Sequence, residues 1–76
     1  MYTVYILQSL SNGRFYAGST QSLSIRIGQH NAGVNASTKS GGPWEVVHTE
    51  QFETRREAIS KEKQIKARGA KRYLGG

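Results

Sequence analysis

The chain opens with a run, residues 2–8, in which both odd and even positions carry large side chains. The run is rich in Tyr, Thr, Val, Ile and Leu, which is typical of a β-strand. Successive side chains of a strand point to opposite faces, so this strand is predicted to be central and covered on both sides. A chain of 76 residues has room for one such domain, predicted to span residues 1–76.

The dipeptide Asn12-Gly13 follows this strand and favours a hairpin turn, because it suits backbone conformations with positive φ. Residues 14–19 are therefore predicted to return as a second strand. A two-residue turn makes the numbers of paired residues sum to 25, and a four-residue loop makes them sum to 23. Both sums are odd, so either register places Tyr5 and Tyr16 on the same face of the sheet.

The next segment has the pattern of a helix of about ten residues, capped by Thr20 or Ser22 and ending at residues 31–33. Its apolar stripe, at helical spacing, also contains two basic residues. The stripe consists of Leu23, Arg26, Ile27 and His30. Arg26 and His30 lie one turn apart beside apolar positions, which predicts a cationic site aimed at the sheet.

Residues 34–43 are small, polar and rich in glycine, which predicts a loop whose Lys39 contacts phosphate or faces solvent. A third strand is predicted from Trp44 to Phe52, with Trp44 in the core or anchoring the loop and His48 without an evident partner. With the helix that follows, the order is strand, strand, helix, strand, helix. This order predicts an α+β fold that resembles a sandwich: a small, three-stranded, mainly antiparallel sheet flanked by helices.

Thr54 and Glu57 form a capping box, so the second helix should begin just after Thr54, and Gly69 should end it. The stripe of this helix that includes core positions consists of Ala58, Glu62 and Ile65. A carboxylate between apolar residues is unfavourable unless something compensates it. A metal ion, a buried arginine, or a position at the edge of the stripe with access to water would each account for Glu62.

The net charge is +6, and residues 55–76 carry all of it, with eight basic residues against two acidic ones. This distribution favours a polyanion as partner, although a solvated helix face has the same composition. The candidate nucleic-acid-binding residues are Lys39, Lys63, Lys66, Arg68, Lys71 and Arg72. The chain contains no cysteine and no evident signal or membrane span, which predicts a cytoplasmic protein. A DNA partner would associate it with the nucleoid.

Several chemistries are excluded by missing motifs. The two histidines lack the spacing of zinc hydrolases, and no Walker A loop is present. The chain contains no aspartate, which argues against a carboxylate cluster for two metal ions. A single metal ion held by a single carboxylate remains compatible with the sequence.

In order and spacing, these residues resemble the GIY-YIG nuclease family along essentially the whole chain, and in particular its small stand-alone bacterial members. The family's motifs and site residues are matched by Thr3-Val4-Tyr5, Phe15-Tyr16-Ala17-Gly18, Arg26, His30, Glu57-Ala58, Glu62 and the loop Ser37 to Trp44. The chain departs from the family in keeping only the tyrosine of the first motif, in carrying Ala17, in lacking an asparagine after Glu62, and in ending before the last helix of many relatives.

The resemblance implies a metal-dependent endonuclease that hydrolyses DNA phosphodiester bonds in repair, recombination or mobile-element processing. The implied catalytic residues are Tyr5, Tyr16, Arg26, His30 and Glu62, with one Mg²⁺ or Mn²⁺ ion on Glu62. Tyr5 is the candidate general base, and nearby cations would have to lower its pKa from about 10; His30 is the alternative. Duplex or branched DNA is the expected partner of a monomer or weak homodimer that does not bind membranes.

Two other functions remain open. One is a nucleic-acid-binding module that keeps the fold without turnover, and the other is an interaction module for an acidic protein. Both explain the charge, but neither requires the five site residues to occur together.

Overall fold

The computed structural model describes residues 1–32 and 42–75, so the predicted contact of Lys39 lies outside the described residues. The elements are β1 (Tyr2–Ser9), β2 (Phe15–Thr20), α1 (Leu23–Asn31), β3 (Trp44–Phe52), α2 (Arg55–Arg68) and α3 (Ala70–Tyr73). The predicted order of strands and helices is confirmed, and the short helix α3 follows the predicted elements. No helix in the described ranges has the length and apolar character to cross a membrane.

The sheet has the order β2-β1-β3, so the strand predicted to be central is central, and both pairings are antiparallel. Tyr5 pairs with Gly18, which is the register of the four-residue loop. The side chain of Ser9 explains this choice, because its Oγ accepts hydrogen bonds from the backbone N–H groups of Ser11 and Asn12, each at 3.1 Å. Gly13 supplies the positive φ of 76° that the loop requires.

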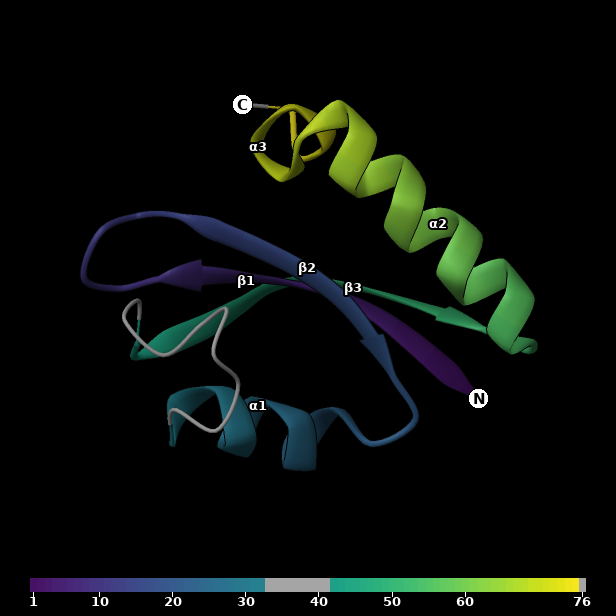
Figure 1. The fold of residues 1–76 in the computed structure, drawn as a ribbon, viewed down its shortest axis with the longest axis horizontal. Helices are drawn as coiled ribbons and strands as arrows, with labels where there is room; N and C mark the ends of the chain where they lie inside the picture. Colours follow the sequence, from purple (N-terminus) through teal and green to yellow (C-terminus); the bar gives the residue numbers. More distant parts are fainter. Residues whose placement is uncertain (33–41, 76) are drawn as a thin grey trace.

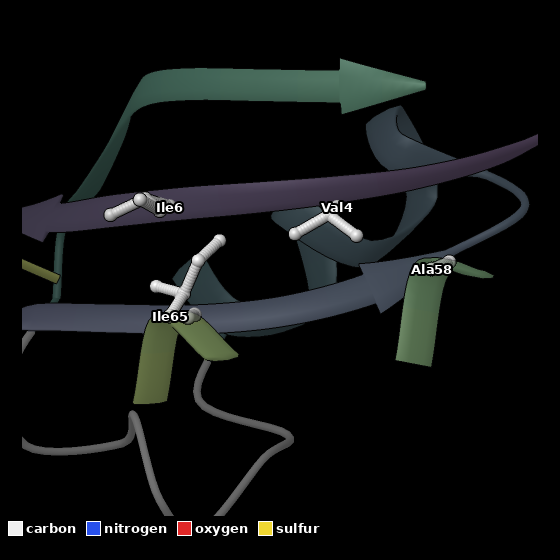
Figure 2. Close-up of a cluster of buried hydrophobic side chains, with 5 residues drawn as sticks. Val4, Ile6, Ala58 and Ile65 are labelled. Atoms are coloured by element: carbon white, nitrogen blue, oxygen red, sulfur yellow. The ribbon is translucent and has the colours of Figure 1, made fainter. Parts of the chain in front are cut away.

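Helices cover both faces of the sheet (Figure 1), as the sequence of β1 predicts. On the face of α2, Val4 and Ile6 of β1 pack with Ala58 and Ile65 (Figure 2), and all four are fully buried. On the face of α1, the buried hydrophobic residues are Tyr5, Leu7 and Trp44, with Leu23 and Ile27 packed against them. Trp44 is thus a core residue, as predicted.

The ends of α2 also follow the sequence. Thr54 accepts a hydrogen bond from the backbone N–H of Glu57, and Gly69 ends the helix with a φ of 94°. The expectation that His48 has no partner is wrong: its Nε2 lies 2.8 Å from a carboxylate oxygen of Glu50, and the Tyr73 hydroxyl of α3 donates to the same oxygen. The hydrogen bond from Tyr73 fixes α3 against β3. No local sequence pattern predicts it, because Tyr73 lies 23 residues from Glu50.

Candidate active site

Tyr5 and His30 form a buried pair on the α1 face of the sheet. The hydroxyl of Tyr5 lies 3.0 Å from Nε2 of His30, and each residue is only 1% exposed. The ring of Tyr16 lies 5.0 Å from the ring of His30, centroid to centroid. The prediction that Tyr5 and Tyr16 share a face is confirmed, and the structure brings both rings to His30.

Gly18 is required for the position of the Tyr5 hydroxyl. The two residues are paired across β1 and β2, and the ring of Tyr5 lies across the glycine. A Cβ at residue 18 would be 2.5 Å from Oη and 2.7 Å from Cζ of Tyr5, which is well inside van der Waals contact. Gly18 therefore makes room for the hydroxyl above the edge strand β2.

Glu62 lies on the other side of the same edge strand, on α2. Its Oε1 accepts a hydrogen bond from the Ser19 hydroxyl at 2.7 Å, and its Oε2 lies 2.8 Å from Nζ of Lys66. Its side chain is 21% exposed. Among the described residues, its compensation thus comes from a lysine, a hydroxyl and partial access to water, not from a buried arginine.

An open cleft of about 690 Å³ runs along this edge of the molecule. Its walls come from Tyr2, the end of β2, the first turns of α1 and the inner side of α2. The lining residues are Tyr2, Ser19, Thr20, Gln21, Ser22, Ile25, Arg26, Gln29, Arg55, Ile59 and Glu62. Arg26 and Glu62 therefore share one cleft, whereas the buried residues Tyr5 and His30 are not among its lining residues.

The electrostatics of the site follow from burial and from Arg26. Burial raises the pKa of Tyr5 to about 12, and the charge of Arg26 counteracts this only in part. Burial, assisted by Arg26, lowers the pKa of His30 below its ordinary value, so the imidazole is neutral at neutral pH. The cations that were expected to lower the pKa of Tyr5 are thus outweighed by its burial in this structure.

Glu62 is ionised at neutral pH. Burial alone would raise its pKa, but the hydrogen bonds from Lys66 and Ser19 outweigh burial and hold the pKa below its ordinary value. The hydrogen bond to Glu62 raises the pKa of Lys66 in turn. The pair is therefore a carboxylate and an ammonium ion, and Arg26 adds a further positive charge near the carboxylate.

The predicted nucleic-acid-binding residues fall into two groups. Lys63, Arg68, Lys71 and Arg72 are exposed and are called here the basic set. Lys66 instead belongs to the site, because it contacts Glu62 and its Nζ lies 5.8 Å from the centroid of the Tyr16 ring. The charge pattern of the sequence groups Lys66 with the surface, although the i, i+4 spacing of Glu62 and Lys66 is a recognised signal for an ion pair.

Ser19 and Arg55 are site residues that the sequence alone does not reveal. Ser19 lies 43 residues from Glu62 in sequence, so only the fold brings them together. In the sequence Arg55 contributes only to the overall charge of the helix, and the structure places it in the lining of the cleft.

The donor atoms around Glu62 suit a hard divalent cation that keeps most of its water. The described residues contain no group of three or more His, Cys, Asp or Glu that could form a cage. One ionised carboxylate facing a cleft with room for water matches the way Mg²⁺ is held by few protein oxygens. The ammonium of Lys66 on Oε2 indicates that a cation is favourable at this oxygen.

The chain is similar to known proteins along most of its length. A family model described as the GIY-YIG catalytic domain matches residues 1–73. A UPF0213 protein of Halobacterium salinarum is 37% identical over 67 residues, which cover 87% of this chain and 86% of the relative. A UPF0213 protein of Listeria welshimeri is 40% identical over 63 residues, which cover 82% of this chain and 69% of the relative. The solution NMR structure of the UPF0213 protein BH0048 from Bacillus halodurans matches with a TM-score of 0.59 and 31% identity, over 99% of this chain and 81% of that chain.

Proposed function

Because the chain belongs to the GIY-YIG family, we propose that it is a divalent-metal-dependent endonuclease that hydrolyses DNA phosphodiester bonds. One observation carries the proposal: Arg26 and Glu62 face the same cleft, and the charge of Arg26 acts on both members of the hydrogen-bonded pair Tyr5–His30. A domain that only binds nucleic acid has no need to bury a tyrosine–histidine pair beside an ionised carboxylate.

Glu62 would hold a Mg²⁺ or Mn²⁺ ion through its carboxylate, with water at the other positions. When bound, such an ion supplies Lewis-acid chemistry, since it withdraws negative charge from the phosphate and from the leaving oxygen. Arg26 lines the cleft and carries a permanent charge, so it would bind the phosphate as negative charge accumulates in the transition state. Ser19 would fix the orientation of the carboxylate through its 2.7 Å hydrogen bond.

Removal of a proton from the attacking water is assigned to Tyr5 and His30 acting together. With a pKa of about 12, Tyr5 is a weak source of phenolate at neutral pH. With its ring proton on Nδ1, neutral His30 can accept the Tyr5 proton at Nε2, 3.0 Å away. The tyrosine oxygen can then take a proton from water while it gives its own to His30, which reconciles the two candidates for the base. Tyr16 would orient the imidazole through ring contact.

The DNA backbone would lie along the cleft, with the basic set supplying charge that is independent of sequence. A protein that acts on chromosomal or plasmid DNA as a monomer or weak homodimer would reside in the cytoplasm, at the nucleoid. Repair, recombination and processing of mobile elements are the settings in which such cleavage is useful.

The experiment is cleavage of supercoiled plasmid with Mg²⁺, with Mn²⁺ and with EDTA. Nicked or linear product with either metal, and none with EDTA, is the expected result. DNA binding without product under any of these conditions would instead favour the non-catalytic binding module.

A further inference from the structure

We infer that Lys66 is a positioning residue that acts through Glu62: it sits on the carboxylate as a cation in the metal-free protein and must leave when a divalent metal ion binds. Lys66 would then set how tightly the site holds its metal. The inference rests on the proposed function, since it concerns the residue assigned there as metal ligand.

The two oxygens of Glu62 are engaged differently. Oε1 accepts a hydrogen bond from the neutral Ser19 hydroxyl at 2.7 Å, which brings no positive charge to the carboxylate. Oε2 carries the ammonium of Lys66 at 2.8 Å. Two cations on one carboxylate oxygen repel each other, so a metal ion and Lys66 compete for Oε2.

The ion pair can open without disturbing the core. The side chain of Lys66 is 51% exposed, and exposed i, i+4 pairs contribute little to stability. The buried residues of α2 are Ala58 and Ile65, so the helix remains anchored when the lysine moves.

A second favourable position is available to the displaced ammonium group. In the structure, Nζ already lies 5.8 Å from the centroid of the Tyr16 ring, a distance at which a cation and an aromatic face attract each other. A long and flexible side chain held there keeps its positive charge beside the site, where it can approach a phosphate. The same residue would thus weaken metal binding and assist the metal-loaded enzyme.

Binding of Mn²⁺, measured by titration calorimetry on the full chain, tests this inference without relying on cleavage. Lys66→Gln should bind Mn²⁺ about three to ten times more tightly than the parent, because the competitor is gone. Lys66→Arg, which keeps the competing charge, should stay within about twofold of the parent. Lys63→Gln is the matched control: it removes the same charge from the neighbour of Glu62, at an exposed position of the basic set.

An unchanged or weaker affinity in Lys66→Gln would overturn the inference, and so would an equal gain in Lys63→Gln, which would reduce the effect to net charge. Glu62→Gln separates this failure from that of the proposed function. If Glu62→Gln abolishes Mn²⁺ binding and Lys66→Gln leaves it unchanged, only the role of Lys66 is wrong. If Glu62→Gln leaves Mn²⁺ binding intact, Glu62 is not the ligand and both proposals fail.

Discussion

Replacing Gly18 with alanine should displace the Tyr5 hydroxyl and damage the site from a position that carries no functional group. The new Cβ would lie 2.5 Å from Oη, 2.7 Å from Cζ and 3.0 Å from Cε2 of Tyr5. Ordinary C···O contacts begin near 3.3 Å, so the hydroxyl must retreat by about 1 Å. Its hydrogen bond to His30 is 3.0 Å long, so a shift of this size is enough to break it.

The loss in stability can be estimated from the same distances. Tyr5 is buried in the cluster with Leu7 and Trp44, so it cannot move into solvent. Overpacking of a core costs about 1–3 kcal/mol, and breaking a buried hydrogen bond costs about 1 kcal/mol more. Gly18→Ala should therefore lower the free energy of unfolding by about 2–4 kcal/mol. Cleavage should fall by about 10²-fold in the fraction that remains folded, since a shift of 1 Å at a reacting group has that effect.

Urea unfolding followed by the fluorescence of Trp44 measures the first quantity, and plasmid cleavage at low temperature measures the second. Gly28→Ala is the matched control, because its Cβ would meet no atom within 4 Å and the residue lies inside α1. That variant should gain up to about 1 kcal/mol, as glycine disfavours helices. Equal stability and activity of Gly18→Ala and the parent would refute the role of Gly18.

Three further predictions concern charge. Arg26→Ala should lower kcat by about 10²-fold with little change in DNA affinity, whereas a change confined to KM would make Arg26 a clamp on the DNA backbone. Replacing the basic set with Gln should weaken binding to all duplexes alike. The slope of log K against log salt should flatten by about 0.9 for each phosphate that the variant no longer neutralises. An unchanged slope would mean that the basic set is not the DNA-binding surface. If Tyr5 passes its proton to His30, the rate of cleavage should rise with pH and become constant above the lowered pKa of His30. A cleavage rate that rises tenfold per pH unit toward about pH 12 would instead identify the Tyr5 phenolate as the base.

The pKa shifts of buried and hydrogen-bonded groups in the folded chain also predict how its stability changes as the pH falls. His30 has a pKa below its ordinary 6.5 in the folded chain, so the unfolded chain takes up a proton first as the pH falls, and stability declines from about pH 6.5 downward. Glu62 and Glu50 have pKa values below 4.5 when folded, so their contribution disappears as the pH falls further, below about 4.5. Urea midpoints measured between about pH 7 and 4 should therefore decrease steadily; a maximum near pH 5 would contradict these shifts.

The fold was predictable because its signals are local. The double-sided pattern of β1, the capping box at Thr54 and the glycine at the end of α2 each depend on neighbours within a few residues. The sequence allows two hairpin registers, and the hydrogen bonds of the Ser9 side chain that select one of them are a local serine turn pattern that only the structure shows to be formed. The resemblance to the GIY-YIG family is confirmed by the match over residues 1–73.

The site was predictable only in part. Because paired residue numbers sum to an odd value in either register, Tyr5 and Tyr16 had to share one face, and the helical stripe correctly aimed His30 at the sheet. The prediction that Arg26 and His30 form one cationic site is wrong, because His30 is buried and its lowered pKa keeps it neutral, whereas Arg26 lines the cleft. The environment of each group was not predictable, since the raised pKa of Tyr5 depends on burial and the ion pair of Glu62 depends on which rotamer Lys66 adopts. Lys66 is the clearest example of what the sequence does not reveal. By composition it belongs to the surface charge, and its contact with Glu62 shows that it belongs to the site.

Single-turnover cleavage of plasmid DNA by the parent and by Glu62→Gln, with DNA affinity and folding measured on the same samples, tests whether Glu62 holds the metal ion that cleavage requires. The substitution keeps the shape of the side chain and removes only the charge that would hold the metal. The parent should cleave with Mg²⁺ or Mn²⁺, and Glu62→Gln should show no detectable cleavage, although it should fold normally and bind DNA nearly as well. A rate in Glu62→Gln close to that of the parent, with metal still required, would contradict this role of Glu62.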